Sequence, residues 1–227
     1  MMRRPFRTLL AICPWVLLGT VGVASEQPYR VEKIAAAPPE ELAPAVRDVL
    51  TGEVLRVVGP GGTLCELWLR KAVPAKAVPT QELGVILGQL AEGTLVAAIR
   101  FPTEVKDYRR QRVKAGVYTL RYALVPVDGN HEGVAPQRDF LLAAPVSADL
   151  DPATVSRDAA LNLSRKTTGA SHPSVWSLGP SDAPPASPPA ILHQGEGDMW
   201  LLQFVMTLNP GSRVAVTLVV VGHAPEA

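Results

Sequence analysis

The middle of the chain reads Val117-Tyr118-Thr119-Leu120-Arg121-Tyr122-Ala123-Leu124-Val125-Pro126 and carries the clearest strand pattern in the sequence. From Tyr118 onward every second side chain is large and apolar, which is the spacing of residues on one face of a β-strand. We expect this face to lie on the core. Arg121 belongs to the opposite set, and we expect it to face solvent. The stretch therefore predicts a strand that is buried on one side.

Short strand patterns separated by glycine and proline turns continue on both sides of this stretch. We expect strands over residues 53–58, 63–71, 83–87, 94–101, 138–146, 172–178, 190–194, 199–208 and 213–222. The sequence shows helical spacing in two places, 39–50 and 153–166. A parallel sheet would need a helix between most strands. The sequence therefore predicts a mainly β fold, an antiparallel β-sandwich or jelly roll with two short peripheral helices.

The N-terminus has the pattern of a secretory signal peptide. A basic start with Arg3, Arg4 and Arg7 precedes the apolar run 8–23, and small residues end in a cleavage site after Ser25. The apolar run of roughly 16 residues is shorter than the ~20 that span a bilayer. We expect cleavage, a periplasmic or extracellular protein, and no stable membrane span afterwards. The arginine pair leaves twin-arginine export open beside the general route.

The remaining chain reads as a tether followed by one domain. Residues 26–38 contain prolines and an alanine run, and we expect them to be the tether. We expect 39–227 to be a single β-sandwich domain. The proline-rich stretch 179–189 has the composition of a linker, but the strands after it are too few to fold alone. We therefore expect it to be a loop within the domain.

Charge and cysteine content limit the classes of partner. Loss of three of the 22 basic residues with the signal peptide leaves 19 against 21 acidic residues, a net charge of −2. We therefore expect no nucleic-acid partner. Cys65 is the one cysteine left, so the mature chain has no internal disulfide, and we expect this thiol to be buried. The charged segment 103–114 predicts a solvated loop, and a docking surface for an anionic partner is the alternative.

No motif in the sequence has the spacing of a known catalytic or cofactor site. The four histidines are not spaced as paired metal ligands, and the elbow of a serine hydrolase and the glycine-rich loops for nucleotides are also missing. We expect no metal and no cofactor. A metal site assembled from distant segments stays an alternative.

The densest polar cluster in the sequence lies at 128–139. Its candidate binding residues are Asp128, His131, Glu132 and Arg138. Binding sites often lie on loops that a rigid sheet positions, whereas Asp-Gly-Asn is also what a plain turn requires. Both interpretations stay open from the sequence.

Trp68 is a second candidate. It shares a strand face with Glu66 and Arg70, which indicates partial exposure. An exposed indole on a sheet is the form of a sugar-binding platform.

One segment resembles a known group of proteins. The run Lys114-Ala115-Gly116-Val117-Tyr118-Thr119-Leu120 is similar to a strand motif of uncharacterised exported bacterial β-sandwich proteins, and the runs 126–131 and 138–142 are similar to them as well. The resemblance implies a β-sandwich and export. It implies no activity and no site residue.

These observations favour an exported protein that binds or scaffolds without catalysis. Its partner would be an envelope protein, a glycan or a small molecule. The alternatives are a metal-dependent or hydrolytic enzyme that uses the 128–139 loop, and a carbohydrate- or envelope-binding module.

Overall fold

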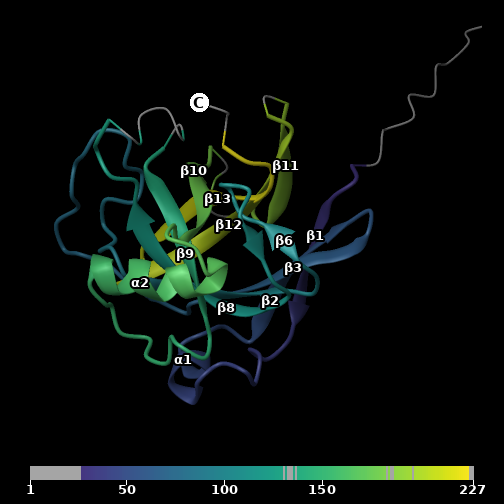
Figure 1. The fold of residues 1–227 in the computed structure, drawn as a ribbon, viewed down its shortest axis with the longest axis horizontal. Helices are drawn as coiled ribbons and strands as arrows, with labels where there is room; N and C mark the ends of the chain where they lie inside the picture. The colour runs from purple at the N-terminus through teal and green to yellow at the C-terminus, as the bar shows by residue number, and fades with distance from the viewer. Residues whose placement is uncertain are drawn as a thin grey trace, which may run out of the picture.

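The computed structural model describes residues 27–129, 131, 135, 137–182, 184, 187–195 and 197–224, so the predicted signal peptide, residues 1–25, lies outside the described residues. The strands are β1 (Arg30–Ala35), β2 (Glu53–Gly59), β3 (Gly62–Leu69), β4 (Val73–Pro74), β5 (Leu95–Phe101), β6 (Val105–Lys106), β7 (Arg112–Val113), β8 (Gly116–Leu124), β9 (Asp139–Pro145), β10 (Ser174–Pro180), β11 (Ala190–Gln194), β12 (Met199–Asn209) and β13 (Arg213–Val221) (Figure 1). The helices are α1 (Pro44–Asp48) and α2 (Arg157–Thr168). Neither of these two helices is long and apolar enough to cross a membrane.

One large sheet contains eleven of the described strands. Its order is β1-β2-β3-β5-β8-β9-β10-β13-β12-β11, and β4 adds to it by a short parallel pairing with β12. The neighbours along this path pair antiparallel. β10 pairs with β9 through residues 174–177 and with β13 through residues 178–180. This strand therefore carries the sheet from its first half into its second.

The two halves of the sheet bury a common core. Leu67, Ile99 and Leu120 come from the first half, Leu202 and Leu218 come from the second, and each is at most 1% exposed. Apolar side chains that alternate along each strand meet between the two halves, as in other β-sandwiches. The predicted class, a mainly β antiparallel sandwich with two short helices, is confirmed.

Besides the two-residue strands β4, β6 and β7, which the sequence did not predict, the structure differs from the expected elements in three main places. Residues 83–87 form no strand, because the amides of Ile86 and Leu87 donate to the carboxylate of Asp139 instead of to a sheet neighbour. The expected tether contains β1, which pairs with β2 along its whole length. Both helices are shorter than predicted, and α2 starts at Arg157 because Ser156 is its N-cap.

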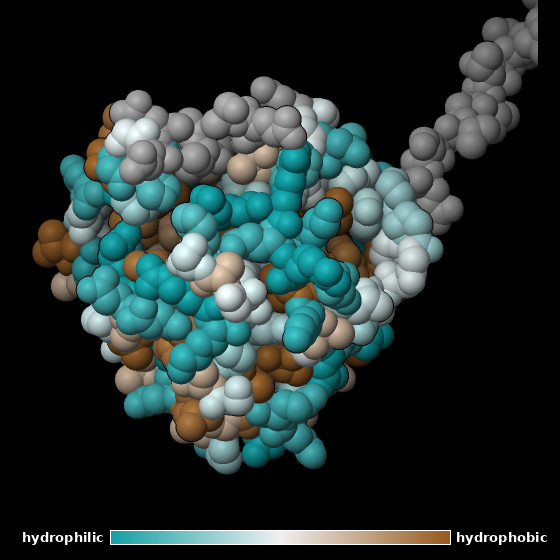
Figure 2. All heavy atoms as spheres, viewed as in Figure 1, coloured by the Kyte–Doolittle hydropathy of each residue, from teal (hydrophilic) through white to brown (hydrophobic). Residues whose placement is uncertain are grey.

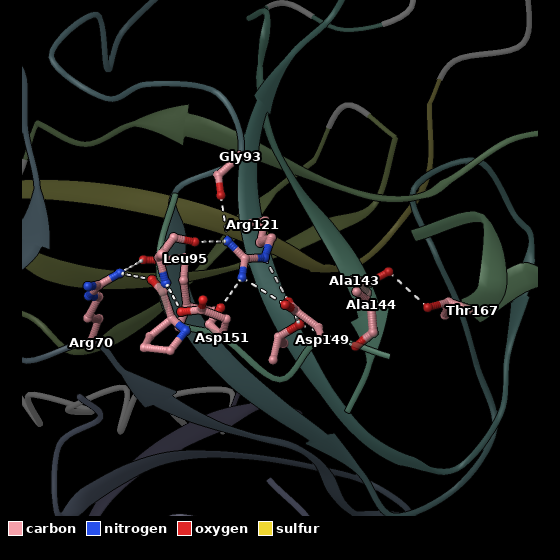
Figure 3. Close-up of polar contacts among 12 residues, drawn as sticks. Arg70, Gly93, Leu95, Arg121, Ala143, Ala144, Asp149, Asp151 and Thr167 are labelled. Atoms are coloured by element: carbon pink, nitrogen blue, oxygen red, sulfur yellow. Dashed lines mark hydrogen bonds and ion pairs between the residues drawn. The ribbon is translucent and has the colours of Figure 1, made fainter. Parts of the chain in front are cut away.

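The prediction for Arg121 is wrong. The side chain points away from the main core, as the alternation requires, but it is 1% exposed because the segment 149–155 covers it. Its guanidinium forms a two-pronged ion pair with Asp149 at 2.7 Å on both prongs (Figure 3). The remaining donors bind the backbone oxygens of Gly93, Asp151 and Ala153.

Cys65 and Trp68 lie on β3, and the sequence analysis made a prediction about the exposure of each. Both are buried in the structure. Cys65 is 1% exposed, as predicted, and burial raises the pKa of its thiol to about 12. Trp68 is 3% exposed, and its indole N–H donates to the carbonyl of Ala36 at 3.1 Å. The expected partial exposure of Trp68 is therefore wrong, because α1 and the chain before it cover this face of the sheet. The ring is not available as a sugar platform.

We predict that Arg121→Met destabilises the protein by about 3–5 kcal/mol, because it leaves the Asp149 carboxylate buried without its partner. The double variant Arg121→Met/Asp149→Leu should recover much of this loss, since it removes both charges. Lys33→Met, which breaks an exposed ion pair with Glu53, serves as the control and should cost less than about 1 kcal/mol. Urea unfolding measures all three. Equal losses for Arg121→Met and Lys33→Met would contradict the assignment.

Candidate functional site

Helix α2 presents a stripe of cationic and apolar side chains on one face. Arg157, Leu161 and Arg165 are spaced four residues apart, so they lie above one another on the helix surface, and all three line the same cavity. The face of α2 that packs on the sheet adjoins this stripe, and it contacts the sheet through Ser164, whose hydroxyl exchanges hydrogen bonds with the backbone of Ser174. The packed face therefore fixes the direction of the stripe.

The loop between β6 and β7 borders the same cavity. Asp107 is 1% exposed and organises this loop by accepting hydrogen bonds from the amides of Arg109 and Gln111 and from the Gln111 side chain. It also accepts from the amide of Val175 on β10. Burial raises the pKa of the Asp107 carboxyl above its ordinary value, and these hydrogen bonds from Gln111, Val175 and Arg109 oppose the rise. Asp107 thus ties the loop to the sheet.

Arg109 and Arg110 occupy the tip of this loop. Arg110 has a φ of 63°, in the left-handed region that side chains other than glycine rarely adopt. Its amide donates to the carbonyl of Asp107 at 2.9 Å, and its guanidinium contacts the ring of His223. The guanidinium of Arg109 forms no hydrogen bond or ion pair with any residue that the structure describes. The tight turn therefore places two adjacent cations at the cavity.

The cavity has a volume of about 590 Å³. The apolar part of its wall is formed by Val125, Pro126, Phe140, Leu161 and Val175. The cationic part is formed by Arg109, Arg110, Arg157 and Arg165. In the space-filling view, hydrophilic residues cover much of the face that carries α2, with apolar residues visible between them (Figure 2). We call this cavity the α2 pocket. Its size is in the range of sites for small molecules.

Asp139 is the one carboxylate among the described lining residues, and its oxygens are occupied. Oδ1 accepts from the amide of Leu87 and the hydroxyl of Tyr122, and Oδ2 accepts from the amide of Ile86. Burial and the adjacent Asp139 carboxylate raise the pKa of the Tyr122 phenol, which keeps the phenol protonated as a donor. Asp139 therefore holds the 82–87 loop in place, and the arginines of the described lining outnumber this single carboxylate.

The predicted binding loop contributes to the α2 pocket in part. His131 lines it, and its Nδ1 lies 2.6 Å from the carboxylate of Asp128. Arg138 instead forms an ion pair with Glu82 at 2.7 Å and donates to the carbonyl of Val125. Glu132 lies outside the described residues. The structure thus brings Asp128 and His131 together and directs Arg138 to a different partner.

The histidines are dispersed over the described part of the chain. His131 and His172 line the α2 pocket, whereas His193 pairs with Asp198 and stacks on Trp200. No three His, Cys, Asp or Glu side chains within the described ranges lie together as a metal site would require.

Sequence reasoning singled out His131 and missed the four arginines. Two of them belong to the charged segment 103–114, for which a docking surface was the alternative to a solvated loop. The other two were detectable as an Arg-x-x-x-Leu-x-x-x-Arg spacing on a predicted helix. The sequence could not show that loop and helix border one cavity, because β10 brings them together only in the folded chain.

Comparison with known proteins provides no relative from which a function could be assigned. No protein-family model, no curated protein and no solved structure matches the chain. The fold and the α2 pocket are therefore interpreted from their own residues.

Proposed function

We propose that this chain is an exported protein that binds a small molecule in the α2 pocket and does not transform it. The observation that carries the proposal is the pocket itself, about 590 Å³ of space that is lined by apolar side chains and by arginines. Pockets of this kind bury an apolar ligand body and orient it through a few polar groups. Export is supported by the composition of residues 1–25.

A binding role fits the way the polar residues around the pocket are used. The carboxylates of Asp107 and Asp139 accept several hydrogen bonds from backbone groups, and their partners fix loops. A general acid or base needs a free position within hydrogen-bond reach of a substrate. These two carboxylates therefore serve as supports of the pocket wall.

Filling the pocket should abolish ligand binding. A thermal-shift panel of aromatic carboxylates, their methyl esters, phosphate monoesters, neutral sugars and amines should contain at least one compound that stabilises the protein. Binding at a hundredfold excess over Kd contributes about 2.7 kcal/mol, roughly 5–10 °C for a domain of this size. Leu161→Trp should remove the shift because the indole occupies the cavity. Leu192→Trp, on the exposed edge strand β11, should keep it.

Two results would contradict this proposal. One is that no compound in the panel shifts the unfolding temperature of the wild-type protein. The other is that the shifts are the same in Leu161→Trp and in the wild type.

The full chain should be processed on export. Expressed in a Gram-negative host, it should appear in the periplasmic fraction with Glu26 as its first residue, as read by mass spectrometry of the purified protein. A chain that lacks residues 2–25 should stay in the cytoplasm. Recovery of the full-length, unprocessed chain in the cytoplasmic fraction would contradict the export assignment.

A further inference from the structure

We propose that the ligand of the α2 pocket is a small organic anion, with a carboxylate or phosphate head bound by arginines and an apolar body against the apolar part of the wall. This inference rests on the proposed binding function and narrows it to a chemical class. Its basis is the distribution of charge, the hydrogen bonds and ion pairs of the individual guanidinium groups, and the size and apolar lining of the pocket.

Positive charge is concentrated at this pocket. The described lining residues include four guanidinium groups and the single Asp139 carboxylate, and Arg157 is paired with Glu92 at 3.1 Å, which leaves a formal charge of +2 with neutral histidines. The entire chain carries a formal net charge of +1. A cluster of one sign in a concave site with low-dielectric walls attracts ligands of the opposite sign.

The guanidinium groups of Arg109 and Arg165 have no carboxylate partner among the described residues. The guanidinium of Arg109 makes no hydrogen bond or ion pair there. Arg165 donates to the backbone oxygen of Ser171 and to the side-chain oxygen of Asn162, which are both uncharged. Other arginines near the pocket are neutralised, as Arg138 is by Glu82. The charge of Arg109 and Arg165 is thus available to an external anion.

These two arginines border the same segment of chain. Arg165 is bound to the carbonyl of Ser171, and the side chain of Gln111 in the β6–β7 loop is bound to the carbonyl of Pro173. The segment 171–175 therefore lies between helix α2 and the loop that carries Arg109. A head group over this segment can be reached from both sides.

The loop that carries Arg109 is ordered before any ligand binds. Asp107 accepts hydrogen bonds from the amides of Arg109 and Gln111, and the amide of Tyr108 donates to the carbonyl of Val175. The backbone that carries Arg109 therefore loses little conformational entropy when the side chain binds a ligand. Arg pairs with carboxylate and phosphate through two parallel N–H···O bonds, which favours these oxyanions over a halide.

The rest of the pocket selects against a bare inorganic ion. Phe140, Leu161 and Val175 provide an apolar surface in the same cavity as the arginines. A space of about 590 Å³ is far larger than one phosphate needs. An aromatic or aliphatic body would bury this surface, so naphthyl phosphate and naphthylacetate are suitable probes.

The decisive experiment is calorimetric titration of naphthyl phosphate, naphthylacetate and the methyl ester of naphthylacetate into the full mature protein. We expect at least one of the two anions to bind, and the ester to bind at least tenfold more weakly than its acid. Binding of the anion should weaken as salt rises from low to high ionic strength. The tighter of the two anions identifies the head group.

Charge-neutral variants test the arginines directly. Arg109→Gln and Arg165→Gln should each weaken anion binding at least tenfold. Arg112→Gln is the matched control, because Arg112 lies on the same hairpin but is paired with Glu104 at 2.8 Å and is absent from the described pocket lining. It should change the affinity less than twofold. Unfolding temperatures of all variants show that each is folded at the titration temperature.

The outcomes separate this inference from the function on which it rests. If the ester binds as tightly as the acid, and Leu161→Trp abolishes both, the pocket binds small molecules but is not specific for anions. If the arginine variants bind the anions like the wild type, the inference is also wrong. If neither anion binds to the wild type, the inference is wrong, and the panel described above decides whether the pocket binds other compounds.

Discussion

The Arg121 guanidinium lies under the surface of the sandwich with all of its N–H donors in use. Two of them bind Asp149, and three bind backbone oxygens of Gly93, Asp151 and Ala153. A buried cation of this kind costs desolvation energy unless its partners are complete. The segment 149–155 supplies four of these five contacts. Arg121 therefore determines the course of the chain between β9 and α2.

The course of the segment 149–155 determines where the α2 pocket lies on the sheet. Gly93 lies directly against Val155, where an added Cβ would come within 2.0 Å of the Val155 carbonyl oxygen. Ser156 follows at once and caps the helix, so the first turn of α2 begins at a fixed point on the sheet. From there the regular helix carries Arg157 and Arg165 to the cavity. The buried ion pair between Arg121 on β8 and Asp149 is in this way connected to the arginines that line the pocket.

Strand alternation explains how much of the fold the sequence could predict. The pattern from Tyr118 to Leu124 correctly indicates which side chains of β8 face the core. The same pattern assigns Arg121 to the other face, and the error was to equate that face with solvent. The segment that covers it lies about thirty residues further along the chain, and no local pattern reports such a contact. β1 was missed for a similar reason, since its alternation is weak and it depends on pairing with β2.

The candidate site was predictable to a smaller extent. His131 was found because its loop combines several polar residues, and it does line the pocket. Arg109 and Arg165 lie in a charged run and on a helix, where most such residues are simply solvated. Their common cavity depends on hydrogen bonds that tie the β6–β7 loop to β10, such as Asp107 to the amide of Val175. Contacts between distant segments of this kind carry no local sequence signal.

Hydrogen–deuterium exchange on the Arg121→Met/Asp149→Leu protein tests most directly whether the buried pair organises this region. This variant leaves no unpaired charge, so it isolates the ordering role from the cost of a buried ion. The account predicts faster exchange in 149–156 and in the first turn of α2, with amides of β8 and β9 as protected as in Lys33→Met. Unchanged exchange in 149–156 would contradict the claim that Arg121 fixes this segment and, through it, the pocket.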